Sequence, residues 1–277
     1  MSDLISALLS YFSYKFVLYA FIVGALVSLC ASLLGVSLVL RRCSMIGDGL
    51  SHVSFGALAI AAVLGFAPLV FSIPIVIVAA VILIKVSQSK KISGDSAIAM
   101  ISSASLALGV IVISLTKGMN TDISSYMFGS LTAMSETDVI LSIVLSVLVL
   151  VFYFFFFNRI FAITFDESFA RASGIKTGRL ENTLAVVTAV TIVIGMRVIG
   201  AMLISALVIF PALTAMRLFK SFRSVCIAAA IISVACAFIG ICLSCLFSIP
   251  TGASIVASNA AAFCIFSLID ILKRRFF

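Results

Sequence analysis

A succession of long apolar runs fills almost the whole sequence and limits what this chain can fold into. There are about nine runs, and most approach the roughly 20 residues that an α-helix needs to cross a bilayer. They cover residues 14–40, 44–66, 68–84, 96–116, 139–157, 183–196, 201–216, 225–247 and 254–271. Because lipid offers the backbone no hydrogen-bond partner, such runs must be helical inside a membrane. The sequence therefore predicts an all-α, polytopic membrane protein with about 8 or 9 transmembrane helices.

The count depends on residues 183–216, which form either two full spans or one span followed by a half-helix. Composition supports the membrane class, because 64% of the residues are hydrophobic and only 10% are charged. The net charge of +8 does not indicate nucleic-acid binding, since the basic residues lie in short loops between apolar runs. These basic clusters are residues 41–42, 85–91, 159–179, 217–223 and 273–275. Placing every cluster in the cytoplasm predicts an external N-terminus and a cytoplasmic C-terminus.

The chain is expected to form one transmembrane domain over residues 1–277. It contains no linker that would separate a second domain and no clear internal repeat. The polar connection at about 117–138 lies outside the cell in the predicted orientation and is too short to fold alone. The first apolar run follows no basic segment, so we expect a retained span rather than a signal peptide.

Asp48 and His52 are ionisable residues within the second apolar run, and His52 is the only histidine in the sequence. Four residues apart, they project from the same face of a helix. Ionisable groups at membrane depth are costly and usually functional. An imidazole and a carboxylate suit a divalent transition metal, although two ligands from one chain make only a transient site. Alternatively, the pair bonds internally or to nearby serines (Ser44, Ser51 and Ser54) and only packs helices.

A compact amphipathic segment at residues 164–179 carries Phe165, Phe169 and Ile175 among charged residues. Gly174 is placed to end a short helix there. Such a helix can dock into a groove on a partner protein. A solvated loop that only connects two spans is the other interpretation, and the segment alone does not decide between them.

Two further features narrow the chemistry. Cys242 and Cys245 form a C-x-x-C pair, but they lie inside an apolar run, where cysteine is usually a small packing residue. The phosphate-binding motif G-x-x-x-x-G-K-[ST] is absent from the sequence. If ATP drives this protein, we expect the nucleotide to bind another chain.

The sequence resembles the membrane permeases of bacterial ABC transporters for zinc, manganese or iron(II), the ABC-3 family, over nearly its whole length. Residues 41–52 resemble the family signature RR-x-S-x-x-GD-x-x-SH, with Gly49 where alanine is common. Residues 125–131 are similar to an external SYLFGSL segment, and residues 165–175 to a cytoplasmic FD-x-x-x-A-x-x-x-G segment. Residues 198–212 are similar to the penultimate conserved region of the family.

The resemblance implies a fold like that of type II ABC importers, the vitamin B12 and metal-chelate permeases, in the bacterial cytoplasmic (inner) membrane. It implies that Asp48 and His52 contact the metal ion, which is a transported substrate and not a bound cofactor. It implies as partners two ATPase subunits, a second permease (the same chain or a paralogue) and an extracytoplasmic metal-binding protein. The permease itself would not be an enzyme. The implied ATPase-docking residues are Phe165, Asp166, Glu167, Ala170, Gly174 and Ile175.

Two alternatives remain open from the residues alone. A secondary transporter would use an ion gradient and need no ATPase, although such proteins often contain inverted repeats. A membrane thiol oxidoreductase would depend on Cys242 and Cys245. The sequence does not identify the metal.

Overall fold

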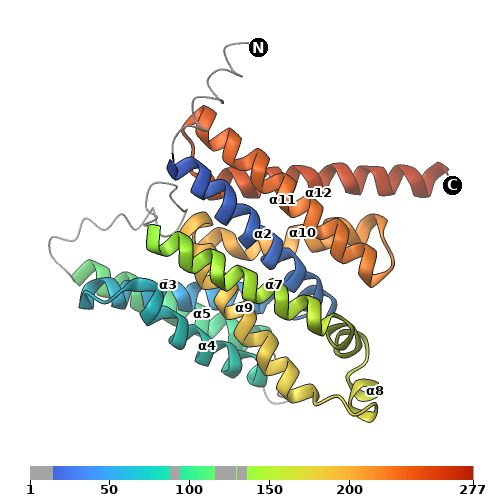
Figure 1. Ribbon diagram of the computed structural model, residues 1–277, viewed down its shortest axis with the longest axis horizontal. Coiled ribbons are helices and arrows are strands. Elements are labelled where there is room, and N and C mark those ends of the chain that lie inside the picture. Colours follow the sequence, from blue (N-terminus) through green and yellow to red (C-terminus); the bar gives the residue numbers. More distant parts are fainter. Residues whose placement is uncertain (1–14, 88–93, 116–128, 130–135, 277) are drawn as a thin grey trace.

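The computed structural model describes residues 15–87, 94–115, 129 and 136–276, and within these residues the chain is helical with no strand (Figure 1). The helices are α2 (Lys15–Leu40), α3 (Met45–Leu64), α4 (Pro68–Ser87), α5 (Gly94–Leu115), α7 (Glu136–Phe165), α8 (Glu167–Ala172), α9 (Thr177–Ile199), α10 (Ala201–Leu218), α11 (Phe222–Phe247) and α12 (Thr251–Phe276). Each predicted apolar run corresponds to one long helix. The all-α class is therefore confirmed.

Eight helices among the described residues are long and apolar enough to cross a membrane. The predicted ambiguity at residues 183–216 is resolved by α9 and α10. The first provides a full candidate span, Thr177–Met196, and the second contains only a shorter apolar stretch, Ile204–Leu218. The two helices are separated at Gly200, whose φ of 96° is readily adopted only by glycine.

Helix α7 is longer than its apolar run and differs from the prediction. The run at 139–157 predicted a polar connection from Asn158 onward, but the helix continues to Phe165. Its 30 residues make it about 45 Å long, well beyond the roughly 30 Å of hydrocarbon. A helix satisfies its own backbone in water as well as in lipid, so a change of polarity alone does not end it.

Helix α2 lies near the centre of the bundle and packs against α7, α9, α10 and α11. Helix α3 packs against α4, α5, α9 and α10. Where α3 meets α5, the backbones of the two helices approach each other closely. A Cβ atom added at Gly56 of α3 would lie 2.7 Å from the carbonyl oxygen of Ser105 in α5. Small residues thus bring these two helices together, as is common in membrane bundles.

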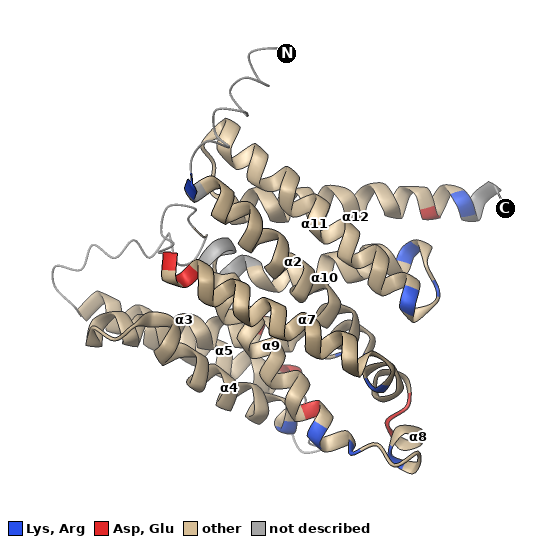
Figure 2. Ribbon diagram, in the orientation of Figure 1, with Lys and Arg blue, Asp and Glu red and all other residues tan. Residues whose placement is uncertain are grey.

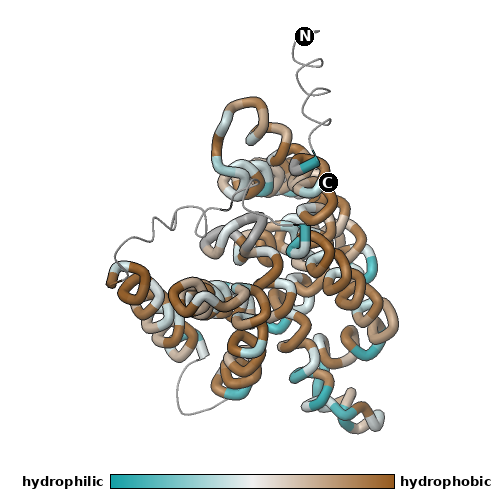
Figure 3. Tube along the Cα trace, turned by 60° about the vertical axis from the view of Figure 1, so that its left-hand side comes forward, coloured by the Kyte–Doolittle hydropathy of each residue, from teal (hydrophilic) through white to brown (hydrophobic). Residues whose placement is uncertain are grey.

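The charged residues are distributed unevenly along the bundle. Apart from Lys15, the lysines and arginines drawn in Figure 2 gather toward its lower and right-hand side, whereas Glu136 and Asp138 begin α7 at the other end. Figure 3 shows the intervening helical segments to be mostly apolar. This separation is consistent with the alternation of basic and non-basic loops in the sequence. The side of the membrane that each end faces stays a prediction.

Candidate metal site and docking helix

The Asp48 and His52 side chains lie together on one face of α3, as their spacing predicted. The Oδ2 atom of Asp48 is 3.7 Å from the Nε2 atom of His52. This distance is within ion-pair range but too long for a hydrogen bond. The two side chains therefore lie side by side without being locked together.

The surroundings of this pair are open on one side. The Asp48 side chain is 43% exposed, whereas His52 is 16% exposed. The second ring nitrogen of His52, Nδ1, is buried and has no hydrogen-bond partner among the described residues. Ser51 donates its hydroxyl to the backbone carbonyl of Asp48, and the Ser54 hydroxyl has no partner in the described part of the chain. The alternative was that the pair bonds internally or to nearby serines and only packs helices; the described hydrogen bonds of Ser51 and Ser54 do not reach the pair, and the alternative stays open.

Asp48 and His52 face a cavity of about 250 Å³ between α3 and α5. Its lining residues are Met45, Asp48, His52, Asp95, Ile98, Ala99, Ser102, Ser103 and Leu106. Asp95 lies in the first turn of α5, where a negative charge suits the positive end of the helix dipole. In the structure it also lines this cavity, which sequence reasoning missed. The sequence could have indicated this, because Asp95 begins an apolar helix at the same predicted membrane surface as Asp48.

The cavity provides too few ligands for a tight metal site. Among the residues that the structure describes, no group of three or more His, Cys, Asp or Glu side chains is placed to hold a metal ion. Asp48 and His52 are thus a two-ligand set within one chain. Gly49 stands where the family signature commonly has alanine. Glycine suits this position, because a Cβ atom there would lie 2.8 Å from the Cγ2 atom of Ile98.

The predicted docking segment forms the short helix α8 between α7 and α9. Asp166 caps its N-terminus by accepting a hydrogen bond of 2.9 Å from the backbone N–H of Phe169. At the other end, Gly174 has a φ of 83°, and its N–H donates to the carbonyl of Arg171. The N–H of Ile175 donates to the carbonyl of Ala170, which completes a Schellman motif. The predicted helix end at Gly174 is confirmed.

The expected docking residues divide into two groups by burial. Ala170 is buried, and Ile175 packs with it against the cluster formed by α2, α7, α9, α10 and α11. Phe165 and Phe169 are 58% and 66% exposed, respectively. Glu167 is exposed and pairs with Arg171, with 2.6 Å between Oε1 and the guanidinium. Some of these residues therefore build the helix, while the exposed ones are available to a partner.

A buried ion pair connects the docking end of α9 to the start of the signature. Arg41, just after α2, pairs with Glu181 in the second turn of α9. Glu181 was not identified from the sequence, because it lies 140 positions from its partner. An isolated acid at the start of an apolar run was the signal available.

Other predicted features contribute less. All seven cysteines are free, and Cys242 and Cys245 are half-buried within α11. The predicted external connection at 117–138 and the SYLFGSL-like segment at 125–131 lie outside the described residues, apart from Gly129 and residues 136–138. The same holds for the N-terminal residues 1–14.

The apolar helical bundle and its intramembrane Asp–His pair define a polytopic membrane transport protein. Residues 13–270 match the model of the ABC 3 transport family. The chain belongs to that family, and the resemblance inferred from the four sequence segments is confirmed.

Particular relatives agree along almost their full length. The chain is 29% identical to the manganese import system permease protein ScaB of Streptococcus gordonii, covering 90% of each protein. It is 28% identical to the high-affinity zinc uptake system membrane protein ZnuB of Haemophilus influenzae, covering 92% of this chain and 97% of the relative. Among solved structures, PsaBC from Streptococcus pneumoniae, determined in complex with Fab, matches with a TM-score of 0.84 and 28% identity over 96% of this chain and 94% of that one. The predicted permease fold is thus confirmed.

Proposed function

We propose that this chain is the membrane-spanning permease subunit of an ABC importer for a divalent transition metal ion. The observation that carries the proposal is the half-open Asp48–His52 pair facing a cavity on α3. A carboxylate and a neutral imidazole match zinc, manganese and iron(II) alike. The relatives ScaB and ZnuB are named for manganese and zinc, which supports this class of substrate without choosing a member.

The two-ligand set suits a transport path better than a storage site. An ion that crosses a membrane must bind well enough to enter and weakly enough to leave. Asp48 is accessible from outside the chain, and α5, beside it, is only 22% buried over its candidate span. A second copy approaching this face would bring a second Asp–His pair and complete a four-ligand site. One copy by itself would then bind the ion only in passing.

The exposed side of α8 is the proposed contact with an ATPase subunit. Phe165 and Phe169 present aromatic surface at the end of the bundle where basic residues gather. Aromatic anchors flanked by charged pairs are typical of binding hot spots. The Schellman turn at Gly174 fixes α8 to α9, so a push on α8 would be transmitted to a transmembrane helix.

The remaining partners and the orientation follow from the same proposal. A metal-binding protein outside the cell would deliver the ion, and the chain would lie in the bacterial cytoplasmic membrane with its C-terminus inside. The ATPase would hydrolyse ATP, and the permease would catalyse no bond change. We propose no permanently bound cofactor.

Metal uptake into vesicles that contain this chain, its ATPase and its delivery protein tests the proposal. Zinc, manganese and iron(II) are offered separately, with and without ATP. We expect ATP-dependent uptake of at least one ion, strongly reduced in His52→Ala. Uptake that ignores ATP but follows an imposed proton gradient would instead establish a secondary transporter. Unchanged uptake in an Asp48→Ala, His52→Ala double variant would refute the site.

A further inference from the structure

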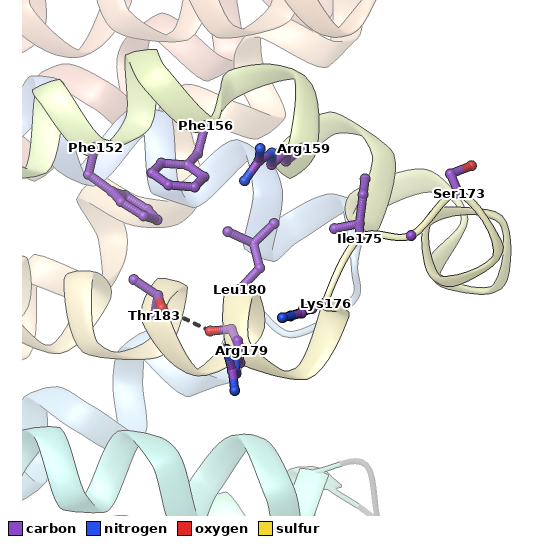
Figure 4. A pocket seen from close by; sticks show the side chains of 10 residues that line it. Phe152, Phe156, Arg159, Ser173, Ile175, Lys176, Arg179, Leu180 and Thr183 are labelled. Atoms are coloured by element: carbon purple, nitrogen blue, oxygen red, sulfur yellow. Dashed lines mark hydrogen bonds between the residues drawn. The ribbon is translucent and has the colours of Figure 1, made fainter.

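A groove of about 550 Å³ lies between α7 and α9, next to the turn that follows α8 (Figure 4). It is separate from the Asp48–His52 cavity, which lies between α3 and α5. Its lining residues are Phe152, Phe156, Arg159, Ser173, Gly174, Ile175, Lys176, Arg179, Leu180 and Thr183. The set combines three basic side chains with an apolar floor and contains no acidic residue.

The basic residues of the groove are free to bind an anion. Arg159, Lys176 and Arg179 form no ion pair with any described residue. The guanidinium carbon of Arg159 lies 5.3 Å from the centroid of the Phe156 ring, a contact that orients the side chain and leaves its N–H groups available. In Figure 4, Arg159 and Lys176 lie on opposite sides of the gap, whereas the Arg179 side chain extends from α9 away from Arg159. The groove is therefore complementary to negative charge.

The apolar floor lies within the membrane-spanning part of the two helices. In Figure 4, the Phe152 and Phe156 rings extend from α7 toward the gap, and Leu180 extends from α9 toward them. The Phe152 and Phe156 side chains that form this floor are themselves only partly buried, and the adjoining Phe155 is exposed. An acyl chain could therefore reach this floor directly from the bilayer.

The position of Arg159 along α7 corresponds to a membrane surface. The apolar run at 139–157 is about 28 Å long at 1.5 Å per residue, close to the roughly 30 Å thickness of the hydrocarbon core. Arg159 follows this run by two residues and so lies at the level of the lipid head groups. Lys176 and Arg179, at the start of α9, belong to the same basic cluster, which the charge distribution places on the cytoplasmic side.

We propose that this groove binds one anionic phospholipid of the surrounding membrane. Arg159 and Lys176 hold the phosphate, Arg179 adds positive charge near the rim, and an acyl chain lies along Phe152, Phe156 and Leu180. A soluble partner would meet the basic rim but could not use the aromatic floor inside the hydrocarbon, which is why lipid fits the whole groove. The bound lipid also contacts the turn at Gly174 and thereby fastens the docking helix to the bundle.

Lipid binding to the purified full-length chain in neutral detergent tests this assignment and requires neither metal nor ATPase. Phosphatidylglycerol, phosphatidylcholine and inorganic phosphate are titrated separately, with native mass spectrometry and thermal unfolding as measurements. We expect one tightly bound phosphatidylglycerol that raises the unfolding temperature, and no comparable effect of the other two. The variant Arg159→Gln, Lys176→Gln, Arg179→Gln should bind it about a hundredfold more weakly, at about fivefold for each cation removed near an anionic group.

The matched control removes three other exposed cations, in Lys85→Gln, Lys220→Gln, Lys273→Gln. It loses the same total charge outside the groove and should bind phosphatidylglycerol like the wild type. Equal weakening in this control would reduce the effect to general surface charge and overturn the proposal. Equal stabilisation by phosphatidylcholine or by inorganic phosphate would overturn it as well.

If the triple groove variant keeps its lipid affinity but no longer binds the ATPase subunit in lipid-free detergent, the basic rim belongs to a protein interface and the lipid proposal is wrong. Because the three replaced side chains are exposed and make no ion pair among described residues, the variant should unfold at the wild-type temperature when no lipid is present. That measurement separates lost binding from lost folding.

Discussion

Two ion pairs stand at the beginning of the signature, seven residues apart, and differ in every physical respect. Arg41 and Glu181 join two helices, are 17% and 6% exposed, and are in hydrogen-bond contact. Asp48 and His52 lie on one helix, 3.7 Å apart, with the carboxylate 43% exposed. The first pair is closed, whereas the second is open, and its His52 Nδ1 atom has no hydrogen-bond partner among the residues that the structure describes.

This difference indicates a structural role for the Arg41–Glu181 pair and fits the transport role proposed for the Asp48–His52 pair. A buried pair between distant segments holds those segments together, and losing one partner leaves the other charge without its counter-charge. A loose pair beside a cavity can exchange its partner for a cation. The same short stretch of sequence thus supplies both an ion pair that joins the end of α2 to α9 and the proposed site for the passing ion.

The largest effect is expected from Glu181→Gln. Removing the carboxylate leaves Arg41 largely buried without a counter-charge, which should lower the free energy of unfolding by about 3 kcal/mol. The estimate takes the low end of the range because Arg41 remains partly exposed. Denaturant unfolding in detergent measures it, with Asp48→Asn as the control that removes a carboxylate from the open pair. If both variants lose the same stability, the proposed contrast between the pairs is wrong.

A second variant sharpens the same contrast. Replacing both members in Arg41→Met, Glu181→Met should recover part of the stability lost in Glu181→Gln, because the buried guanidinium that lost its counter-charge is removed as well. The recovery is expected to be about 2 kcal/mol in the same unfolding experiment. A double variant less stable than Glu181→Gln would show that the two residues act independently.

His52→Ala should reduce metal uptake about tenfold, roughly 1.4 kcal/mol of transition-state free energy. Its unfolding free energy should change by less than about 1 kcal/mol, since the ring has no strong hydrogen bond to lose. Uptake and unfolding are measured on the same preparation. If His52→Ala loses much stability but shows normal uptake per folded molecule, the Asp48–His52 pair has a structural role and not a transport role.

Asp95→Asn should have a smaller effect on uptake, about fivefold, because Asp95 lines the cavity without joining a ligand cluster. A single negative charge a few ångströms from a cation contributes about 1 kcal/mol when water is present. Uptake at low and high ionic strength measures it, because salt should weaken only this long-range contribution. An effect as large as that of His52→Ala would make Asp95 a direct ligand.

The smallest effect is expected from Cys242→Ser, Cys245→Ser. Both thiols are free and half-buried in α11, away from the cavity that holds Asp48 and His52. Uptake should change by less than about twofold, in keeping with cysteine as a small packing residue. Abolished function would revive the thiol oxidoreductase interpretation.

Local sequence rules were sufficient for much of this molecule. The apolar runs located every long helix, because a helix in lipid must be about as long as the membrane is thick. The four-residue spacing placed Asp48 and His52 on one face, and Gly174 marked the end of α8, because both effects act within a turn of the chain. Family membership followed from residues that are close together in sequence.

Tertiary structure decided what lies far apart in sequence. The pairing of Arg41 with Glu181, the position of Asp95 at the α3 cavity and the burial of Ala170 on the inner face of α8 depend on how helices pack. So does the groove that joins Arg159 of α7 to Lys176 and Arg179 of α9. Periodicity fixes which face of a helix a residue occupies but not which helix that face meets. In this bundle the neighbouring helix determines whether a charged side chain forms a buried ion pair, lines a cavity or lines a groove.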